Sequence, residues 1–427
     1  MREDLLHFIW KYKKLPLKDL VTSKNEAVVI VDAGRHNHLA GPDFFNAQVR
    51  IDEQLWAGNV EIHIKSSDWY AHHHEKDRNY DNVILHVVWE EDVEVFRSDN
   101  SEIPTLQLKN YISDRLLGAY QDLFDKKGSR FINCEKDIGQ TDAFTIKNWL
   151  ERLFFERLER KSNVVFTLLE DSKTDWENVF FVLLLKNFGL KINGDAFLSL
   201  AKALDFSIVR KLQHDPFQLE SVLYGMSHLL DDDTISDEYH MLLKKEYRYL
   251  QHKFSLEEER VQKPEFFKLR PPNFPTIRLS QLASLYHKHQ NLFSLVIEAT
   301  TLEEIYTIFD VSASRYWDDH FTFGKSSRKG VKKLTKKFID LLIVNTILPI
   351  KFCYSRHLNE AVDETISSIA LALDKEENSV VSNFAAHGVT AENAMESQGI
   401  LQLYNEYCTK NKCLQCTIGT GLLTQNS

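Results

Sequence analysis

The chain up to residue 110 alternates between short apolar runs and polar turns, a pattern typical of strands. Residues 2–14 are amphipathic and predict a short helix. Runs rich in β-branched and aromatic residues predict strands, which cover 27–32, 44–51, 55–65 and 82–89, with 103–108 as a further edge strand. A polar connector, 67–80, separates the third and fourth of them. The order helix, three strands, connector and strand predicts an α/β module with a mixed four- to five-stranded sheet.

After residue 140 the apolar residues recur three and four positions apart, which predicts amphipathic helices. Asn193 and Ser236 stand where helix N-caps are expected. The proline-rich segment 268–280 is predicted to be extended, and either to separate two helical regions or to wrap over one. The sequence therefore predicts an α+β chain with a large all-α region after the module. We expect three domains, which are an α/β domain over 1–115, a helical domain over 116–265, and a second helical region with a cysteine cluster over 266–427.

The composition is ordinary for a soluble globular protein, with 43% hydrophobic and 27% charged residues. The net charge of −10 argues against a generally basic nucleic-acid coat, although a local basic groove is compatible with it. The apolar run 179–185 is too short to span a bilayer, and Asp340, Asn345 and Pro349 interrupt the run 338–350. The N-terminus has acidic residues and no apolar core of signal-peptide length. We expect a cytoplasmic protein.

Three titratable residues occupy every second position of the third predicted strand. Because side chains two apart on a strand point to the same side, Glu61, His63 and Lys65 should share one face. Asp43 lies one short hairpin earlier. Two hard carboxylates suit Mg²⁺ or Mn²⁺, which keeps bound waters and lowers their pKa. The sequence predicts Asp43 and Glu61 as metal ligands, with His63 and Lys65 as the other candidate catalytic residues.

The Pro42-Asp43 pair before an acid-bearing strand, in this order of elements, resembles the PD-(D/E)XK nuclease superfamily. The resemblance implies a restriction-endonuclease-like fold and cleavage of DNA or RNA, with a lysine two residues after the strand acid. This chain has His63 at that position and lysine only at position 65. Two registers stay open, with Glu61 as the ligand and His63 in the lysine's role, or with His63 as the ligand. We favour the first, because Mg²⁺ prefers oxygen ligands.

Further histidines follow in the connector and the next strand. His72 and His74 could chelate a transition metal, since neutral imidazole is a good ligand for one. A polar, exposed connector is the simpler interpretation, and we favour it. His86 lies in an apolar strand, where a buried imidazole needs a partner. We expect that partner to be a backbone group, with Glu61 or Asp43 as the alternative.

A basic segment, 325–337, contains seven Lys or Arg residues and no acid. It is the clearest candidate for contacts to backbone phosphates, and a solvated loop is the alternative. The candidate residues are Lys325, Arg328, Lys329, Lys332, Lys333 and Lys336.

Three late cysteines, Cys408, Cys413 and Cys416, follow a C-x4-C-x2-C spacing. The Cys-x2-Cys pair suits Zn²⁺ or an iron–sulfur cluster, and free, half-buried thiols are the alternative. A fourth ligand is needed, and nothing in the sequence selects among Cys134, Cys353 and His387. An odd total of five cysteines does not indicate a disulfide framework.

Several segments together resemble a bacterial family of unknown function, family 2851, over most of the chain. They are GPDFFNA, GNVEIHIKSSDW, YDNVILHVVWE, RPPNFPTIRLSQLA, NTILP, SQGILQLY and CLQC. The resemblance implies one architecture for the full length and no particular activity. Three functions stay open. The first is a metal-dependent nuclease or nucleic-acid-processing protein, and the second is a non-catalytic binding or scaffold protein with a degenerate nuclease-like fold. The third is a transition-metal hydrolase that uses His72, His74 and His86.

Overall fold

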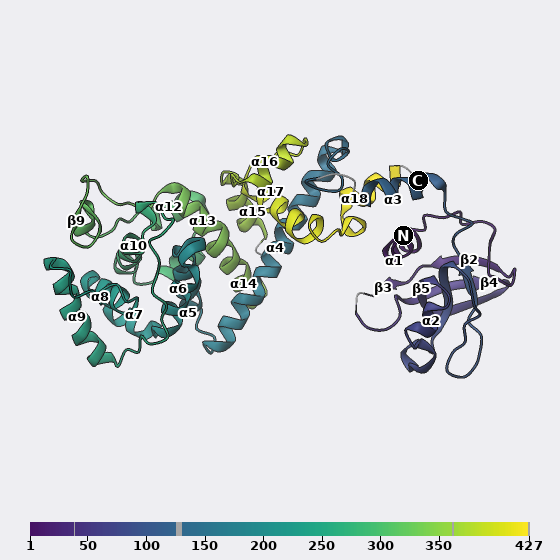
Figure 1. Cartoon of the computed structure of the whole chain (residues 1–427), viewed down its shortest axis with the longest axis horizontal. Helices are drawn as coiled ribbons and strands as arrows, with labels where there is room; N and C mark the ends of the chain where they lie inside the picture. Colours follow the sequence, from purple (N-terminus) through teal and green to yellow (C-terminus); the bar gives the residue numbers. More distant parts are fainter. Residues whose placement is uncertain (38, 125–129, 361–362, 426–427) are drawn as a thin grey trace. The chain divides into compact units, whose positions relative to one another are not determined.

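The computed structural model describes residues 1–37, 39–124, 130–360 and 363–425. The chain forms two compact units. The sheet unit comprises Met1–Trp149, Asn383–Val389 and Leu403–Ser427, and the helical unit comprises Leu150–Ser382 and Thr390–Gln402. The C-terminal segment thus returns to the unit that contains the N-terminus (Figure 1). The division into three domains stays a prediction.

A mixed sheet forms the centre of the sheet unit, as the sequence predicted. Its strands are β1 (Leu20–Val21), β2 (Ala27–Asp32), β3 (Arg35–His36), β4 (Phe44–Ile51), β5 (Gln54–Lys65), β6 (Val83–Glu90) and β7 (Thr105–Gln107). They pair in the order β1-β2-β4-β5-β6-β7, and β3 pairs with β4. The pairs up to β5 are antiparallel, whereas β5–β6 and β6–β7 are parallel. The sheet has more strands than predicted because β1 and β3 are two residues long and leave no periodicity in the sequence.

The connection from β5 to β6 crosses back over the sheet through short helical pieces. It contains α2 (Asp68–Ala71) and two 3-10 turns, His74–Lys76 and Arg78–Tyr80. Trp69 of α2 is fully buried and packs with Tyr80 and Val83. β6 is buried along most of its length, as expected for a strand that is covered on both faces.

Helix α1 (Glu3–Lys11) contacts β5 and buries its apolar side chains. The indole N–H of Trp10 donates to the Ala33 carbonyl at 2.9 Å, which fixes the helix against the end of β2. His7 is a polar residue within the apolar run from Leu5 to Trp10, and α1 carries it to the sheet.

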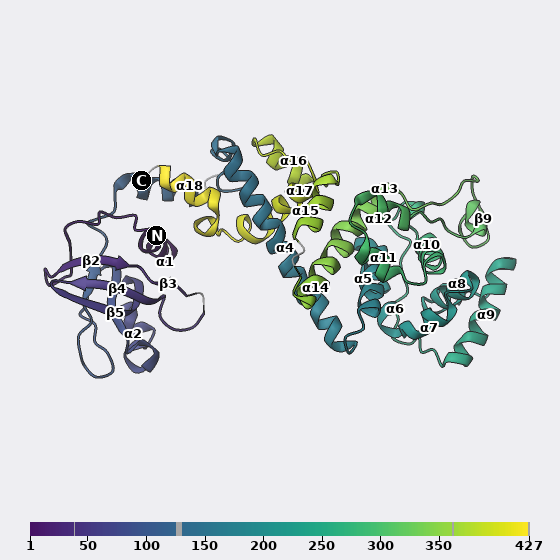
Figure 2. The ribbon, with the colours of Figure 1, turned by 180° about the vertical axis from the view of Figure 1, so that it is seen from behind.

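The remaining helices of the sheet unit come from both ends of the chain. They are α3 (Asp114–Phe124), the beginning of α4 (Ala143–Asp171), the end of α16 (Ser379–Ala386), a π-helical stretch (Leu403–Cys408) and α18 (Thr417–Gln425), with 3-10 turns at Ile138–Gln140 and Cys413–Gln415. Helix α18 contacts α3, and the two lie side by side in both views (Figures 1 and 2).

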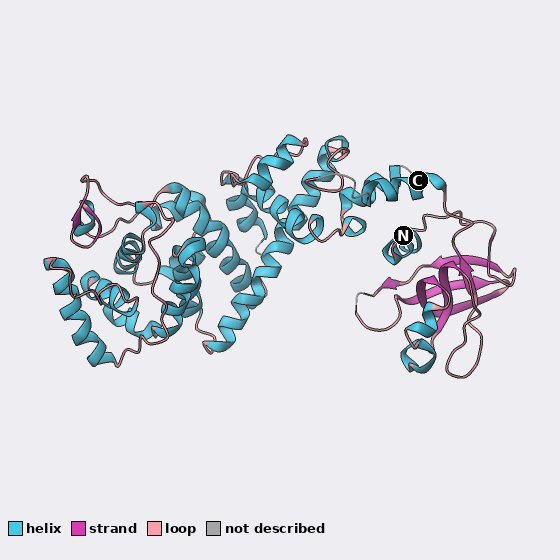
Figure 3. Ribbon diagram, in the orientation of Figure 1, coloured by secondary structure: helices cyan, strands magenta, loops and turns pink. Residues whose placement is uncertain are grey.

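The helical unit consists of helices and one short hairpin (Figure 3). After α4 they are α5 (Trp176–Phe188), α6 (Leu190–Ala203), α7 (Phe206–Leu212), α8 (Pro216–Met226), α9 (Glu238–Phe254), α10 (Pro275–Lys288), α11 (Leu292–Glu298), α12 (Leu302–Ile308), α13 (Lys336–Leu342), α14 (Leu348–Leu358), α15 (Asp363–Ala372), α16 (Ser379–Ala386) and α17 (Ala394–Gln402); 3-10 turns cover Pro271–Asn273 and Arg315–Asp318, and the hairpin is β8 (His320–Thr322) and β9 (Lys325–Ser326). One large apolar core joins most of these helices.

A continuous helical segment, Lys336–Leu358, joins α13 and α14 through a π-helical stretch, Ile343–Ile347. Its length and the mean hydropathy of 1.5 in its most apolar window of 18 residues would allow it to cross a membrane. However, 72% of its most apolar window is buried inside the structure, and core helices of soluble proteins have the same properties. This segment is therefore weak evidence for a membrane span.

Three local predictions in the helical unit are wrong. Asn193 lies inside α6, where its side chain bonds to the backbone of Glu265 instead of capping a helix. Asp237, and not Ser236, caps α9 by accepting from the N–H of His240. The predicted extended segment is helical from Pro275 onward, because proline at the first position of a helix needs no N–H donor.

The close contact of α8 with α9 generates a stability prediction. A Cβ on Gly225 would lie 2.1 Å from Cγ of the buried Tyr247 ring, so Gly225→Ala should destabilise the helical unit by about 1–3 kcal/mol through overpacking. At Gly194, a Cβ would meet its nearest neighbour at an ordinary 3.5 Å. Gly194→Ala in the interior of α6 should leave stability unchanged or raise it by up to about 1 kcal/mol. Denaturant unfolding of the full chain measures both, and equal effects of the two variants would contradict the proposed packing constraint.

Candidate metal centre

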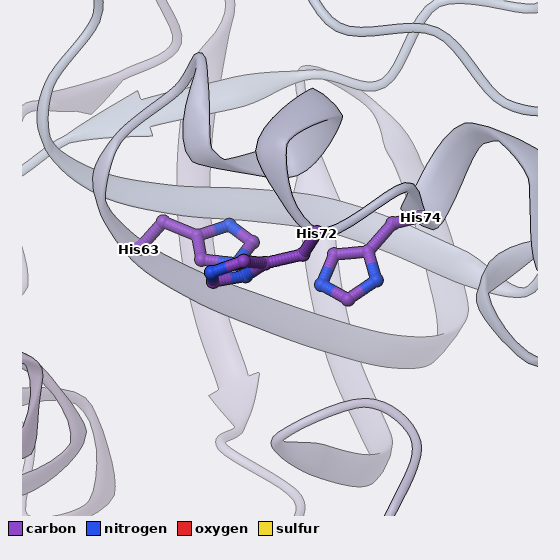
Figure 4. A group of neighbouring side chains, drawn as sticks. All are labelled: His63, His72 and His74. Atoms are coloured by element: carbon purple, nitrogen blue, oxygen red, sulfur yellow. The ribbon is translucent and has the colours of Figure 1, made fainter.

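Strand β5 and the connector after α2 bring three histidines together (Figure 4). His63 lies on β5, two residues after Glu61, and both side chains are buried. His72 is the C-cap of α2, and His74 begins the next 3-10 turn. Between them His73 has φ = +62°, a left-handed conformation that is uncommon for a residue other than glycine. This bend turns His72 and His74 toward His63.

The three imidazoles form a nearly equilateral group. Their ring centroids are 5.0, 5.3 and 5.4 Å apart, and their ligand atoms all lie within 4.8 Å of one another. His63 Nε2 is 3.1 Å from His72 Nδ1. Tetrahedral binding with metal–nitrogen bonds of about 2 Å would place ring centroids about 5 Å apart. His63, His72 and His74 therefore have the separations that one tetrahedral ion requires.

Glu61 lies directly beside this histidine triad. Its Oε1 is 3.6 Å from His63 Nε2 and 3.4 Å from His74 Nε2. Burial, and after it the nearby Asp43 carboxylate, raise the pKa of Glu61 to about 9. A buried carboxylate is costly without a positive partner, so a cation bound by the triad would stabilise the charged form of Glu61.

His86 lies behind the triad on β6, where it pairs in register with Glu61. Its Nε2 is 2.8 Å from His63 Nδ1. The expectation of a backbone, Glu61 or Asp43 partner for His86 is therefore wrong, because its partner is another histidine. Burial lowers the pKa of His63 to about 2 and that of His86 to about 3, so both rings are neutral at physiological pH. A neutral His63 can donate from Nδ1 to His86 and present Nε2 to a metal, a common arrangement for histidine ligands.

A second polar group adjoins the triad at the start of β4. The Asp43 N–H donates to Glu61 Oε2 at 3.1 Å, and Asp43 Oδ2 accepts from the N–H of Ile62 at 3.0 Å. His7 Nε2 lies 3.2 Å from the same carboxylate oxygen. Burial lowers the pKa of His7, but Asp43 and then Glu3 outweigh this effect, and the net pKa is raised. Asp43 is thus joined to Glu61 on one side and to His7 on the other.

His7 was not among the site residues predicted from the sequence. Lys65 was predicted as a catalytic residue, but it does not lie beside the triad. His7 is signalled only as a polar residue within an apolar helical run. Lys65 is exposed at the end of β5, and its backbone N–H donates to the Asp68 carboxylate at 2.9 Å. The triad and Glu61 come together without its amine.

The basic segment 325–337 lies in the helical unit, and several of its lysines already have protein partners. Lys333, Lys336 and Lys337 pair with Asp310, Asp374 and Glu377. The Lys332 amine donates to the carbonyls of Asp318 and Gly330. The pairs of Lys336 and Lys337 are exposed and 3.7 Å long, so they contribute little and phosphate could compete for these amines. Nucleic-acid binding by this segment stays a prediction.

Of the candidate fourth partners for Cys408, Cys413 and Cys416, Cys134 is the one that lies beside them, in the sheet unit. Cys353 belongs to α14 of the helical unit. His387 contacts the Asn383 carbonyl and Glu135 instead.

The family model for a protein of unknown function, DUF2851, matches residues 3–379. This range includes the histidine triad, Glu61 and Asp43, whereas the three C-terminal cysteines follow it. No curated protein and no solved structure matches the chain. Because the match spans most of the 427 residues, the chain belongs to the DUF2851 family of proteins of unknown function.

Proposed function

We propose that the sheet unit is a metal-dependent hydrolase that cleaves phosphodiester bonds in nucleic acid. The observation that carries this proposal is the convergence of His63, His72 and His74 at metal-binding separations, with Glu61 beside them. Three imidazoles favour zinc or another transition metal over Mg²⁺. The proposed ion therefore differs from the Mg²⁺ or Mn²⁺ that two carboxylate ligands would select.

Each polar side chain has a role in the proposed reaction. The three histidines would hold the ion and leave its fourth position open to water, as is usual in catalytic zinc sites. The bound ion would supply a water of lowered pKa, and Glu61 would accept the proton of that water. The water oxygen would form a bond to phosphorus while the ester P–O bond breaks. His7, whose pKa Asp43 raises, would supply a proton to the leaving oxygen.

The order of elements supports nucleic acid as the substrate. Helix α1, the antiparallel strands β2, β4 and β5, a helical connector and the parallel strand β6 follow one another along the chain. We base the proposal of a restriction-endonuclease-like fold on this order. The same proposal assigns the two acidic positions of the nuclease resemblance to Asp43 and Glu61. The basic segment 325–337 offers further charge for a polyanion.

A non-catalytic nucleic-acid-binding or scaffold protein is the second candidate. The exposed position of Lys65 favours it, since the catalytic lysine of the PD-(D/E)XK nuclease superfamily would have no counterpart in the centre. Metal binding and cleavage must therefore be measured separately.

The triad should bind one Co²⁺ ion per chain after removal of metals by a chelator. Nitrogen and oxygen ligands in tetrahedral geometry give visible absorption without the charge-transfer band of thiolate ligands. His72 is exposed, so His72→Ala should not disturb the fold. It should weaken Co²⁺ binding by at least about 10–100-fold, because mutating even a hydrogen-bond partner of a metal ligand typically weakens metal affinity by that factor. His73→Asn is the matched control, because asparagine tolerates a positive φ. Unchanged Co²⁺ affinity in His72→Ala would rule out the triad as the metal site.

Cleavage of single-stranded DNA, double-stranded DNA and RNA should occur with Zn²⁺, Co²⁺ or Mn²⁺. Glu61→Gln should lower the rate by about 10²–10⁴-fold, the usual contribution of a general base, and Asp43→Asn should lower it by removing the partner of His7. Lys65→Ala should cleave at the parent rate. A parent chain that binds Co²⁺ and cleaves none of these substrates would favour the non-catalytic candidate, and cleavage by Glu61→Gln at the parent rate would exclude the proposed base.

A further inference from the structure

Four cysteines line one apolar space in the sheet unit. Cys134, Cys408, Cys413 and Cys416 surround it, and the other lining side chains are mostly apolar: Ile138, Leu403, Tyr407 and Ile418, with Asn133 and Gly419. Cys134, Cys413 and Cys416 are buried. The folded chain thus adds a distant thiol to the C-x4-C-x2-C motif.

Each of the three late cysteines stands at the end of a helical segment. Cys408 is the last residue of the π-helical stretch Leu403–Cys408, a rare form that is frequent at functional sites. Cys413 begins a 3-10 turn, and Cys416 ends that turn just before α18. Gly419 is required here, because a Cβ on it would lie 2.3 Å from the Cys413 carbonyl oxygen. One π-helical stretch and one 3-10 turn therefore hold three thiols around one space.

The thiols are close enough to affect one another's charge. Burial raises the pKa of Cys134, and Cys416 and Cys413 raise it further. Burial likewise raises the pKa of Cys408, with added contributions from Cys134, Cys416 and Cys413. Four adjacent thiolates would repel one another strongly, so the free thiols stay protonated. A bound positive charge would reverse this preference.

N–H groups point at two of the sulfurs. The Asn133 side-chain amide donates to Cys413 Sγ at 3.3 Å. The backbone N–H groups of Ile418 and Gly419 hydrogen-bond to Cys416, with the Trp149 side chain as a further partner. A protonated thiol is a weak acceptor, whereas hydrogen bonds to thiolate sulfur are a regular feature of iron–sulfur sites. The donors therefore suit ionised, metal-bound cysteines.

The spacing of the thiols distinguishes between a single ion and a larger group. One zinc ion holds four thiolates about 3.8 Å apart, because each Zn–S bond is about 2.3 Å. In the part of the chain that the structure describes, the histidine triad has all its ligand atoms within 4.8 Å of one another, and no trio of these thiols meets that distance. At least one pair in every trio of these thiols is thus more than 4.8 Å apart, which is further than one zinc ion requires.

We infer that Cys134, Cys408, Cys413 and Cys416 bind an iron–sulfur cluster through four thiolates. The cluster fills the apolar space between them and joins the C-terminal turns to the segment after α3. Its role is structural, because it links two parts of the sheet unit that are far apart in the sequence. This site is independent of the histidine triad and of the proposed hydrolysis.

The full chain, produced and purified without oxygen, tests the inference by analysis of iron, acid-labile sulfide and zinc. We expect iron and sulfide in equal amounts, at two or four of each per chain, together with the visible absorption of a cluster. Cys408→Ser and Cys134→Ser should each lose the bound iron. Cys353→Ser, which changes the buried cysteine of α14, is the control and should keep it.

One further measurement excludes a general loss of structure, and a second tests the structural role of the cluster. The cysteine variants should keep the Co²⁺ binding of the histidine triad, and their C-terminal segment should be cleaved faster than that of the parent in limited proteolysis. Zinc without iron in the parent would overturn the inference, as would the absence of both metals. Full iron content in Cys134→Ser would exclude the distant thiol as a ligand.

Discussion

The parallel pairing of β5 with β6 is the constraint on which the candidate metal centre depends. Parallel neighbours cannot be joined by a hairpin, so the chain must cross back over the sheet between them. Here the crossing is short and passes over the face of β5 that carries Glu61 and His63. His72 and His74 lie in this crossing, and the same register places His86 opposite Glu61. One pairing thus brings together residues from three separate segments.

Burial gives this arrangement its chemical character. Glu61 and His63 are 5% and 2% exposed, so water does little to stabilise charge on either. Burial therefore favours a protonated Glu61 carboxyl and a neutral His63 imidazole, and this imidazole already has the form that binds metal. Glu61 must lose its proton before it can act as a base. A cation at the triad would stabilise the carboxylate that this loss produces.

The sequence predicts the strands well, because alternation and β-branched runs are local signals. It therefore places Glu61 and His63 on one face of β5, as the structure does. It does not predict that His72 and His74 face them, since this depends on a left-handed residue, His73, in a connector without periodicity. The partner of His86 and the position of Cys134 beside the late cysteines depend on contacts between distant segments. The N-cap of α9 is Asp237 and not Ser236 because both residues are acceptable caps locally, and α10 begins at Pro275 because a proline can open a helix as readily as it can end one.

The two proposed centres place opposite demands on their ligands. At the triad, burial lowers the pKa of His63, and this favours the neutral form that binds a cation. At the cysteine site, burial raises the pKa of every thiol, although thiolates are the binding form. Metal binding at the cysteine site therefore requires the four thiols to lose protons that they keep when no metal is bound. Hydrogen bonds from Asn133 and from the first turn of α18 partly offset this cost, which explains why donors surround the cysteines while carboxylates and imidazoles surround the triad.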